Sequence, residues 1–233
     1  MITERWALVN GIRTFWRSQD SWMYHARSFI TAQRHHSEAI ILGYFTLAIT
    51  KALKFEARVN QFWAFAFNMP QIQKHAVCHS HGADVACSAL KLPLGPDRRM
   101  ETLILIAPAV EHDFRRNGLN DALRENRLGR VVILCSRNDM TLKWLARATR
   151  IALGWIPWGI GKAITYGYLG YIAAEKPARL HIDPEIRDRV IIYDMSPMDH
   201  NDYFEPVFVD RTHAIIAALG QRTEAEKIEG ATL

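Results

Sequence analysis

The stretch Cys78-His79-Ser80-His81-Gly82-Ala83-Asp84 joins an apolar run, residues 75–79, to the small-residue run ADVACSAL. A serine between a strand and a helix, in the pattern small-x-Ser-x-Gly, is typical of a nucleophile elbow, a tight turn that presents the hydroxyl above a sheet. Close packing requires small residues two positions before and after the serine. Gly82 meets that demand, and Cys78 stands where a glycine is usual. The N–H groups of the following helix favour negative charge, so the stretch predicts Ser80 as a nucleophile.

Short apolar runs recur on both sides of this stretch, with helix-like segments between them. The runs show no inside/outside alternation, which is typical of parallel strands buried on both faces. The alternation predicts an α/β fold: a doubly wound, mostly parallel six-stranded sheet with helices on both faces and functional groups at the carboxyl ends of the strands. The predicted strands are 6–10, 39–44, 75–79, 102–107, 131–135 and 190–194, and the predicted helices are 55–68, 83–92, 142–153 and 206–219.

Two polar loops that follow later strands contain the partners that a serine nucleophile needs. A hydroxyl is a poor nucleophile until a base removes its proton, and the base needs an acid to hold its tautomer. Asp139 follows the run 131–135, and His200 follows the last run, in the segment DHNDYF. Asp113, after the run 102–107, is the rival position for the acid. Asp199 and Asp202 are interpreted as loop caps or surface charges.

In these residues and their order along the chain, the sequence resembles the α/β-hydrolase family, whose members carry nucleophile, acid and histidine in that order. The resemblance extends from about residue 6 to residue 219. It implies a catalytic triad of Ser80, Asp139 and His200. Because the first predicted strand leads directly into the loop Asn10-Gly11-Ile12, it also implies a compact member that lacks the first two strands of the family's sheet.

The resemblance further implies an oxyanion hole built from two backbone N–H groups, those of His81 and Ile12. Gly11 gives the early loop its conformational freedom and lines the substrate site. We interpret the side chain of His81 as lining the mouth of the site. His75, His79 and His81 do not converge on one ion, so we expect no metal, and without a Gly-x-Gly-x-x-Gly or Walker motif we expect no cofactor.

An apolar segment rich in aromatic residues and glycine spans residues 151–174, between the acid and histidine strands. It contains Pro157, Lys162 and five glycines, which argue against a transmembrane helix. We expect a cap or lid over residues 142–182, with Trp155 and Trp158 binding the acyl or aromatic part of a substrate. The alternative is a buried crossover helix. The whole hydrolase domain is predicted to span residues 1–220, followed by a C-terminal tail, 221–233.

Composition excludes several other classes of protein. Hydrophobic residues make up 49% and charged residues 23% of the chain, as in folded globular proteins. The net charge of +5 is scattered, which argues against nucleic acid and leaves a weak contact with an anionic membrane surface open. The three cysteines, Cys78, Cys87 and Cys135, are interpreted as buried hydrophobes in a reducing compartment. The charged N-terminus does not resemble a signal peptide, so we expect a cytoplasmic protein.

The expected function is hydrolysis of a carboxylic ester or a related acyl bond in a small molecule or lipid. Two alternatives stay open. The same triad can support acyl transfer or thioester cleavage, and the same fold can serve a binding protein without catalysis.

Overall fold

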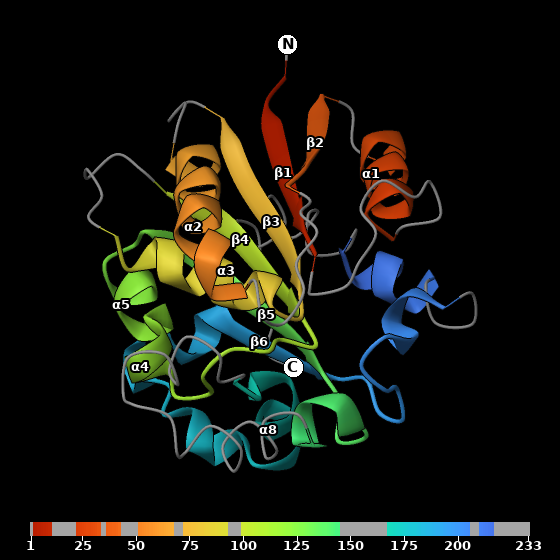
Figure 1. The fold of residues 1–233 in the computed structure, drawn as a ribbon. Helices are drawn as coiled ribbons and strands as arrows, with labels where there is room; N and C mark the ends of the chain where they lie inside the picture. Colours follow the sequence, from red (N-terminus) through yellow and green to blue (C-terminus); the bar gives the residue numbers. More distant parts are fainter. Residues whose placement is uncertain are drawn as a thin grey trace.

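A computed structural model describes residues 2–10, 22–33, 36–42, 51–67, 72–92, 99–144, 167–205 and 210–216. These residues contain one six-stranded sheet with the strand order β2-β1-β3-β4-β5-β6 (Figure 1). All five neighbouring pairs are parallel. The strands are β1 (Glu4–Val9), β2 (Ser37–Ile41), β3 (Gln73–His79), β4 (Met100–Ile106), β5 (Leu128–Cys135) and β6 (Val190–Asp194). The predicted fold class is confirmed.

Helices cover both faces of this sheet. Figure 1 shows α2 (Lys51–Phe67) and α3 (Gly82–Leu90) on one side and α1 (Trp22–Gln33) on the other. The remaining helices are α4 (Phe114–Asn117), α5 (Leu119–Arg124) and α8 (Leu169–Glu175), with 3-10 turns η2 (Pro177–Leu180), η3 (Pro184–Arg189) and η4 (Asp202–Phe204). Residues 140–144 and 210–216 are also helical. No helix within the described ranges is long and apolar enough to cross a membrane.

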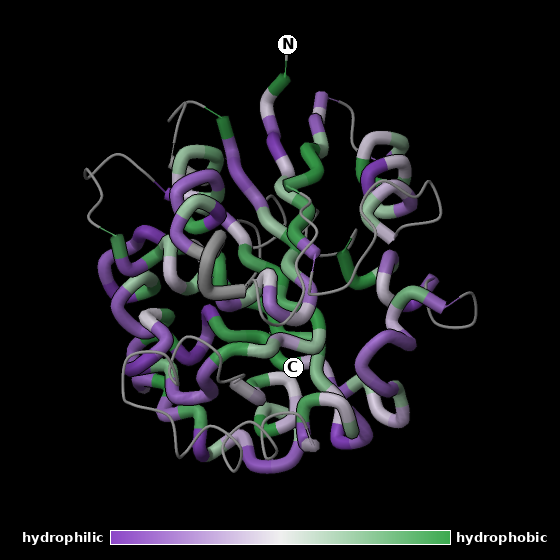
Figure 2. The backbone as a smooth tube through the Cα atoms, in the orientation of Figure 1, coloured by the Kyte–Doolittle hydropathy of each residue, from purple (hydrophilic) through white to green (hydrophobic). Residues whose placement is uncertain are grey.

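Alternate residues along each strand supply two separate hydrophobic cores. On β3, Ala76 and Cys78 belong to the core under α2 and α3, whereas Val77 points to the opposite core, which α1 covers with Met23 and Ile30. Both faces of the strand are therefore fully buried, and Figure 2 shows the hydrophobic colours concentrated along the central strands. This two-sided burial explains why the strand sequences are continuously apolar.

Aromatic residues of α2 pack the helix onto the sheet. Phe62 is buried, and Trp63 and Phe65 are partly buried against the same core. The side chain of Phe67 lies outside the described part of the structure.

Candidate active site

Ser80 stands in a sharp turn between β3, which ends at His79, and α3, which begins at Gly82. Its φ of 53° lies in the left-handed region, which a residue with a Cβ rarely adopts. Backbone hydrogen bonds hold the turn: the Ser80 N–H donates to the Ile106 carbonyl, and its carbonyl accepts from the N–H groups of Ala83 and Ala109, at 3.0–3.1 Å. The side chain is partly exposed between buried neighbours. The fold therefore presents this hydroxyl in a strained turn, which the surrounding backbone hydrogen bonds hold in place.

Gly82 allows this turn to approach the end of β1. A Cβ at this position would lie 2.7 Å from the Val9 carbonyl oxygen and 3.1 Å from that of Asn10. Because both are backbone atoms, one in β1 and one in the residue directly after it, neither can move away at low cost. This position therefore requires a small residue because the elbow packs against the end of β1.

His200 joins Ser80 to Asp139 through its two ring nitrogens. Its Nε2 lies 2.9 Å from the Ser80 Oγ, and its Nδ1 lies 2.9 Å from the Asp139 Oδ2. Because a carboxylate only accepts hydrogen bonds, the Nδ1 carries a proton and the Nε2 is free to accept one from the serine. This is the tautomer that base catalysis by a histidine requires.

Asp139 is fully buried at the end of β5, and its carboxylate is satisfied on both oxygens. Oδ2 bonds to His200, and Oδ1 accepts from the Leu142 N–H at 2.8 Å, at the start of the helical residues 140–144. A buried carboxylate without such partners would be costly. These two hydrogen bonds therefore fix the orientation of the Asp139 carboxylate before any substrate binds.

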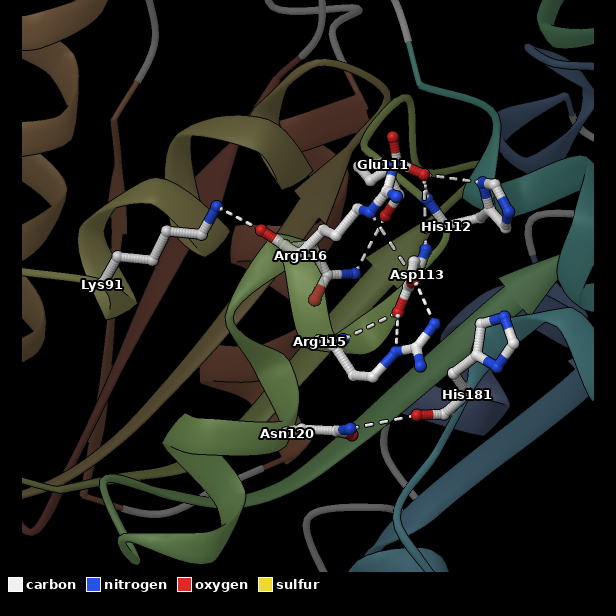
Figure 3. A network of polar contacts seen from close by, with 9 residues as sticks. Lys91, Glu111, His112, Asp113, Arg115, Arg116, Asn120 and His181 are labelled. Carbon is white, nitrogen blue, oxygen red and sulfur yellow. Dashed lines mark hydrogen bonds and ion pairs between the residues drawn. The ribbon is translucent and has the colours of Figure 1, made fainter.

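Asp113, the rival acid, has a different role in the structure. Its side chain caps α4 by accepting from the Arg115 N–H at 3.0 Å, and it also forms an ion pair with the Arg115 guanidinium at 2.8 Å. Figure 3 shows the carboxylate facing that guanidinium within a polar cluster that includes Glu111 and His112. The Arg115 side chain holds the pKa of Asp113 at about 2. His200 is thus hydrogen-bonded to Asp139, whereas Asp113 is bonded to Arg115.

The two predicted oxyanion-hole donors are only partly described. His81 directly follows Ser80, has helical dihedrals of φ −65° and ψ −19°, and is the N-cap residue of α3, so its N–H lies at the N-terminal end of that helix. Gly11 and Ile12 lie outside the described residues, as do Trp155 and Trp158. The side chain of His81 is 0% exposed, so the interpretation that it lines the mouth of the site is wrong. It packs into the turn beside Asp84 instead.

The three cysteines do not offer an alternative nucleophile. Cys78, Cys87 and Cys135 are free and buried. Burial raises the pKa of the Cys87 and Cys135 thiols to about 12 and raises that of Cys78 as well, so these sulfurs stay protonated and unreactive. No group of three or more His, Cys, Asp or Glu side chains within the described ranges is arranged to hold a metal ion.

Sequence reasoning missed two residues that contact His200 through its backbone. The His79 Nε2 lies 3.1 Å from the His200 carbonyl oxygen, and the Asp199 Oδ1 accepts from the His200 N–H at 2.7 Å. The only sequence signal was their position, one residue before Ser80 and one before His200. Asp199 was expected to be a cap or a surface charge, and it does cap the loop.

The described part of the predicted cap segment includes α8. α8 lies against the loops after β4 and β5: the Gly170 N–H donates to the Pro108 carbonyl at 3.0 Å, and the Ser136 N–H donates to the Gly170 carbonyl at 3.1 Å. Tyr168 and Tyr171 pack against Ala109 and Leu142. This part of the segment therefore supports the two loops that flank Ser80 and Asp139.

Comparison with known proteins identifies the fold. No protein-family model and no curated protein matches the sequence. Among solved structures, a putative hydrolase from Agrobacterium vitis matches with a TM-score of 0.56 at 15% identity, over 93% of this chain and 88% of that one. MenH from S. aureus matches with a TM-score of 0.52 at 12% identity, over 96% of each chain. The Pyrococcus furiosus esterase Pf2001 matches with a TM-score of 0.50 at 10% identity, over 95% of this chain and 81% of that one. This chain therefore has the α/β-hydrolase fold.

Proposed function

We propose that this protein is a serine hydrolase that cleaves a carboxylic ester or a related acyl bond. The observation that carries the proposal is the hydrogen-bonded series from Ser80 through His200 to Asp139, with both distances at 2.9 Å. These distances lie within the range that proton transfer between a nucleophile and its base requires. The names of the fold neighbours, which include a hydrolase and an esterase, agree with this class.

In the proposed reaction, the Ser80 Oγ attacks the acyl carbonyl while the His200 Nε2 takes the hydroxyl proton. Asp139 holds the imidazole in place and stabilises its charged form. The resulting oxyanion accepts hydrogen bonds from the N–H groups of His81 and Ile12. His200 then returns the proton to the leaving alcohol, which leaves an acyl-serine. Water, activated by the same histidine, hydrolyses the acyl-serine and regenerates the hydroxyl.

The substrate proposal concerns the apolar cap segment, residues 142–182, and Trp155 and Trp158 within it. Large apolar side chains next to an acyl-transfer site bind the acyl or aromatic part of an ester. The proposed substrate is therefore a small-molecule or lipid ester with an apolar acyl group. Acyl transfer and thioester cleavage use the same three residues and differ only in the nucleophile or leaving group that enters.

A series of p-nitrophenyl esters of increasing acyl length tests the proposal. We expect turnover by the wild-type protein and a loss on the order of 10⁴–10⁶ in Ser80→Ala. Ser88→Ala, which changes a half-buried serine on α3, the helix that follows Ser80, is the matched control and should retain turnover within twofold of wild type. Turnover in Ser80→Ala within tenfold of wild type would exclude Ser80 as the nucleophile. Faster cleavage of the matching thioesters would instead favour a thioesterase.

A further inference from the structure

Both backbone polar groups of His200 are bound by side chains outside the proposed triad. The His79 Nε2–H donates to the His200 carbonyl oxygen at 3.1 Å, and the His200 N–H donates to the Asp199 Oδ1 at 2.7 Å. We propose that His79 and Asp199 are positioning residues, which clamp the His200 backbone so that its ring reaches both Ser80 and Asp139. This inference rests on the proposed function, in which His200 is the base.

Each of the two positioning residues also links His200 to another part of the proposed triad: His79 to the turn of Ser80, and Asp199 to the loop of Asp139. His79 is the last residue of β3 and directly precedes Ser80, so its bond ties the nucleophile turn to the histidine loop. The Asp199 Oδ1 also lies 3.1 Å from the N–H of Met140, the residue after Asp139. That N–H is shared with the Asn138 carbonyl, at 2.7 Å. The two side chains thus connect three loops that are distant in sequence.

His79 is suited to act as a fixed donor. Because a carbonyl oxygen only accepts, the His79 proton must lie on Nε2. The ring is buried among Trp22, Phe204 and His200, at centroid distances of 6.2, 5.1 and 5.2 Å. Burial, together with the nearby charge of His200, lowers the pKa of His79 to about 3. The imidazole therefore keeps a single protonation state at neutral and mildly acidic pH, and its bond to His200 persists there.

Asp199 is suited to act as an acceptor for several N–H groups at once. Its side chain is partly buried, and its own N–H donates to the Asp202 Oδ2 at 2.8 Å, which fixes the backbone of the loop. One carboxylate oxygen then receives the N–H groups of both His200 and Met140. Losing this oxygen frees the start of the histidine loop and the start of the acid helix together. Displacements of about 1 Å in catalytic groups reduce rates by about 100-fold.

The first experiment compares disruptive with conservative variants, using ester turnover. His79→Leu removes the donor, whereas His79→Gln keeps an N–H at a similar reach. Asp199→Ala removes the acceptor, whereas Asp199→Asn keeps one carbonyl oxygen. We expect kcat to fall about 10- to 100-fold in His79→Leu and Asp199→Ala with KM changed by less than about threefold, and the conservative variants to recover most of kcat. Asp121→Ala, which changes an exposed aspartate paired with Arg124, is the surface control and should match wild type.

The second experiment repeats the disruptive changes in a His200→Ala background. If His79 and Asp199 act only through His200, they should not lower the residual turnover further. A merely structural role predicts the same fold-loss in both backgrounds. Wild-type kcat in His79→Leu and Asp199→Ala, or equal losses with and without His200, would overturn the clamp.

A third readout needs no substrate. The low-field proton NMR signal of the His200 Nδ1–H, bonded to Asp139, should broaden in the two disruptive variants and persist in the two conservative ones. An unchanged signal in all four variants would contradict the clamp. A wild-type protein without ester turnover would contradict the proposed function instead, and the NMR comparison would still decide whether the clamp exists.

Discussion

At the scale of single residues, Asp139 and Asp113 show how environment separates two carboxylates that look alike in sequence. Asp139 is buried and bonded to His200, whereas Asp113 is bonded to Arg115. We expect Asp139→Asn to lower kcat by about 10⁴, because the amide favours the wrong histidine tautomer. Asp113→Asn should keep kcat within about threefold and cost at most about 1 kcal/mol of stability, because asparagine can still cap α4 and only the ion pair with the exposed Arg115 side chain is lost. Steady-state kinetics and urea denaturation of both variants test this. A larger kinetic loss in Asp113→Asn would transfer the role of the acid.

His79 gives the molecule a predictable sensitivity to acid. Its pKa is lowered from 6.5 to about 3 in the folded state, so between these values the unfolded chain binds a proton that the folded protein does not. Stability is therefore fully present above pH 6.5 and falls as the pH drops towards 3. Between pH 7 and pH 5, wild type should lose about 2 kcal/mol more of its unfolding free energy than His79→Gln. Urea denaturation at the two pH values measures this difference. Equal losses in the two proteins would mean that His79 is protonated in the folded state.

Sequence order was enough to predict which residues the structure would bring together at the site. Ser80, Asp139 and His200 each follow an apolar strand, and parallel strands end at the same edge of a sheet. The contacts of His79 and Asp199 with His200 were not predictable, because they depend on how loops far apart in sequence fold over one another. The burial of the His81 side chain was missed for the same reason: its position in the elbow is visible in the sequence, but the direction of its side chain is not.

At the scale of elements, the junction of β3 and α3 depends on Gly82. Replacing glycine with alanine in a helix normally stabilises it by up to about 1 kcal/mol. Here the added Cβ would lie 2.7 Å from the Val9 carbonyl oxygen, and relieving such overpacking costs about 1–3 kcal/mol. We therefore expect Gly82→Ala to be destabilised and to lose turnover, as Ser80 shifts. Chemical denaturation tests the sign, with Ser88→Ala as the control on the same helix. A more stable Gly82→Ala protein would contradict this account.

The strands were predicted better than the helices. Continuous apolar runs locate all six strands, and the run 190–194 coincides with β6. The other five strands begin two or three residues earlier than predicted, because polar residues such as Gln73 and Glu4 still join the ladder at the exposed end of the sheet. α1 was not predicted. Its buried residues Met23, Ala26 and Ile30 do follow helical spacing, but polar and charged residues between them dilute the pattern.

For the molecule as a whole, the apolar cap segment is the element that we propose to bind the acyl group. Its described helix α8 packs on the loops that follow β4 and β5, and the second of these loops carries Asp139. We expect Trp155→Ala and Trp158→Ala to raise KM for octanoyl esters at least fivefold more than for acetyl esters, because a longer acyl chain buries more apolar area. Michaelis–Menten kinetics on the two esters measure the ratio. Equal changes for both esters would assign these residues to the core.

Covalent labelling shows whether the fold activates Ser80 as a nucleophile. A fluorophosphonate reacts with a serine hydroxyl only when a neighbouring base activates it. We predict one adduct per chain, located on Ser80 by peptide mass spectrometry, with no adduct in Ser80→Ala and much slower labelling in His200→Ala. An unlabelled wild-type protein, or an adduct on another residue, would contradict the account.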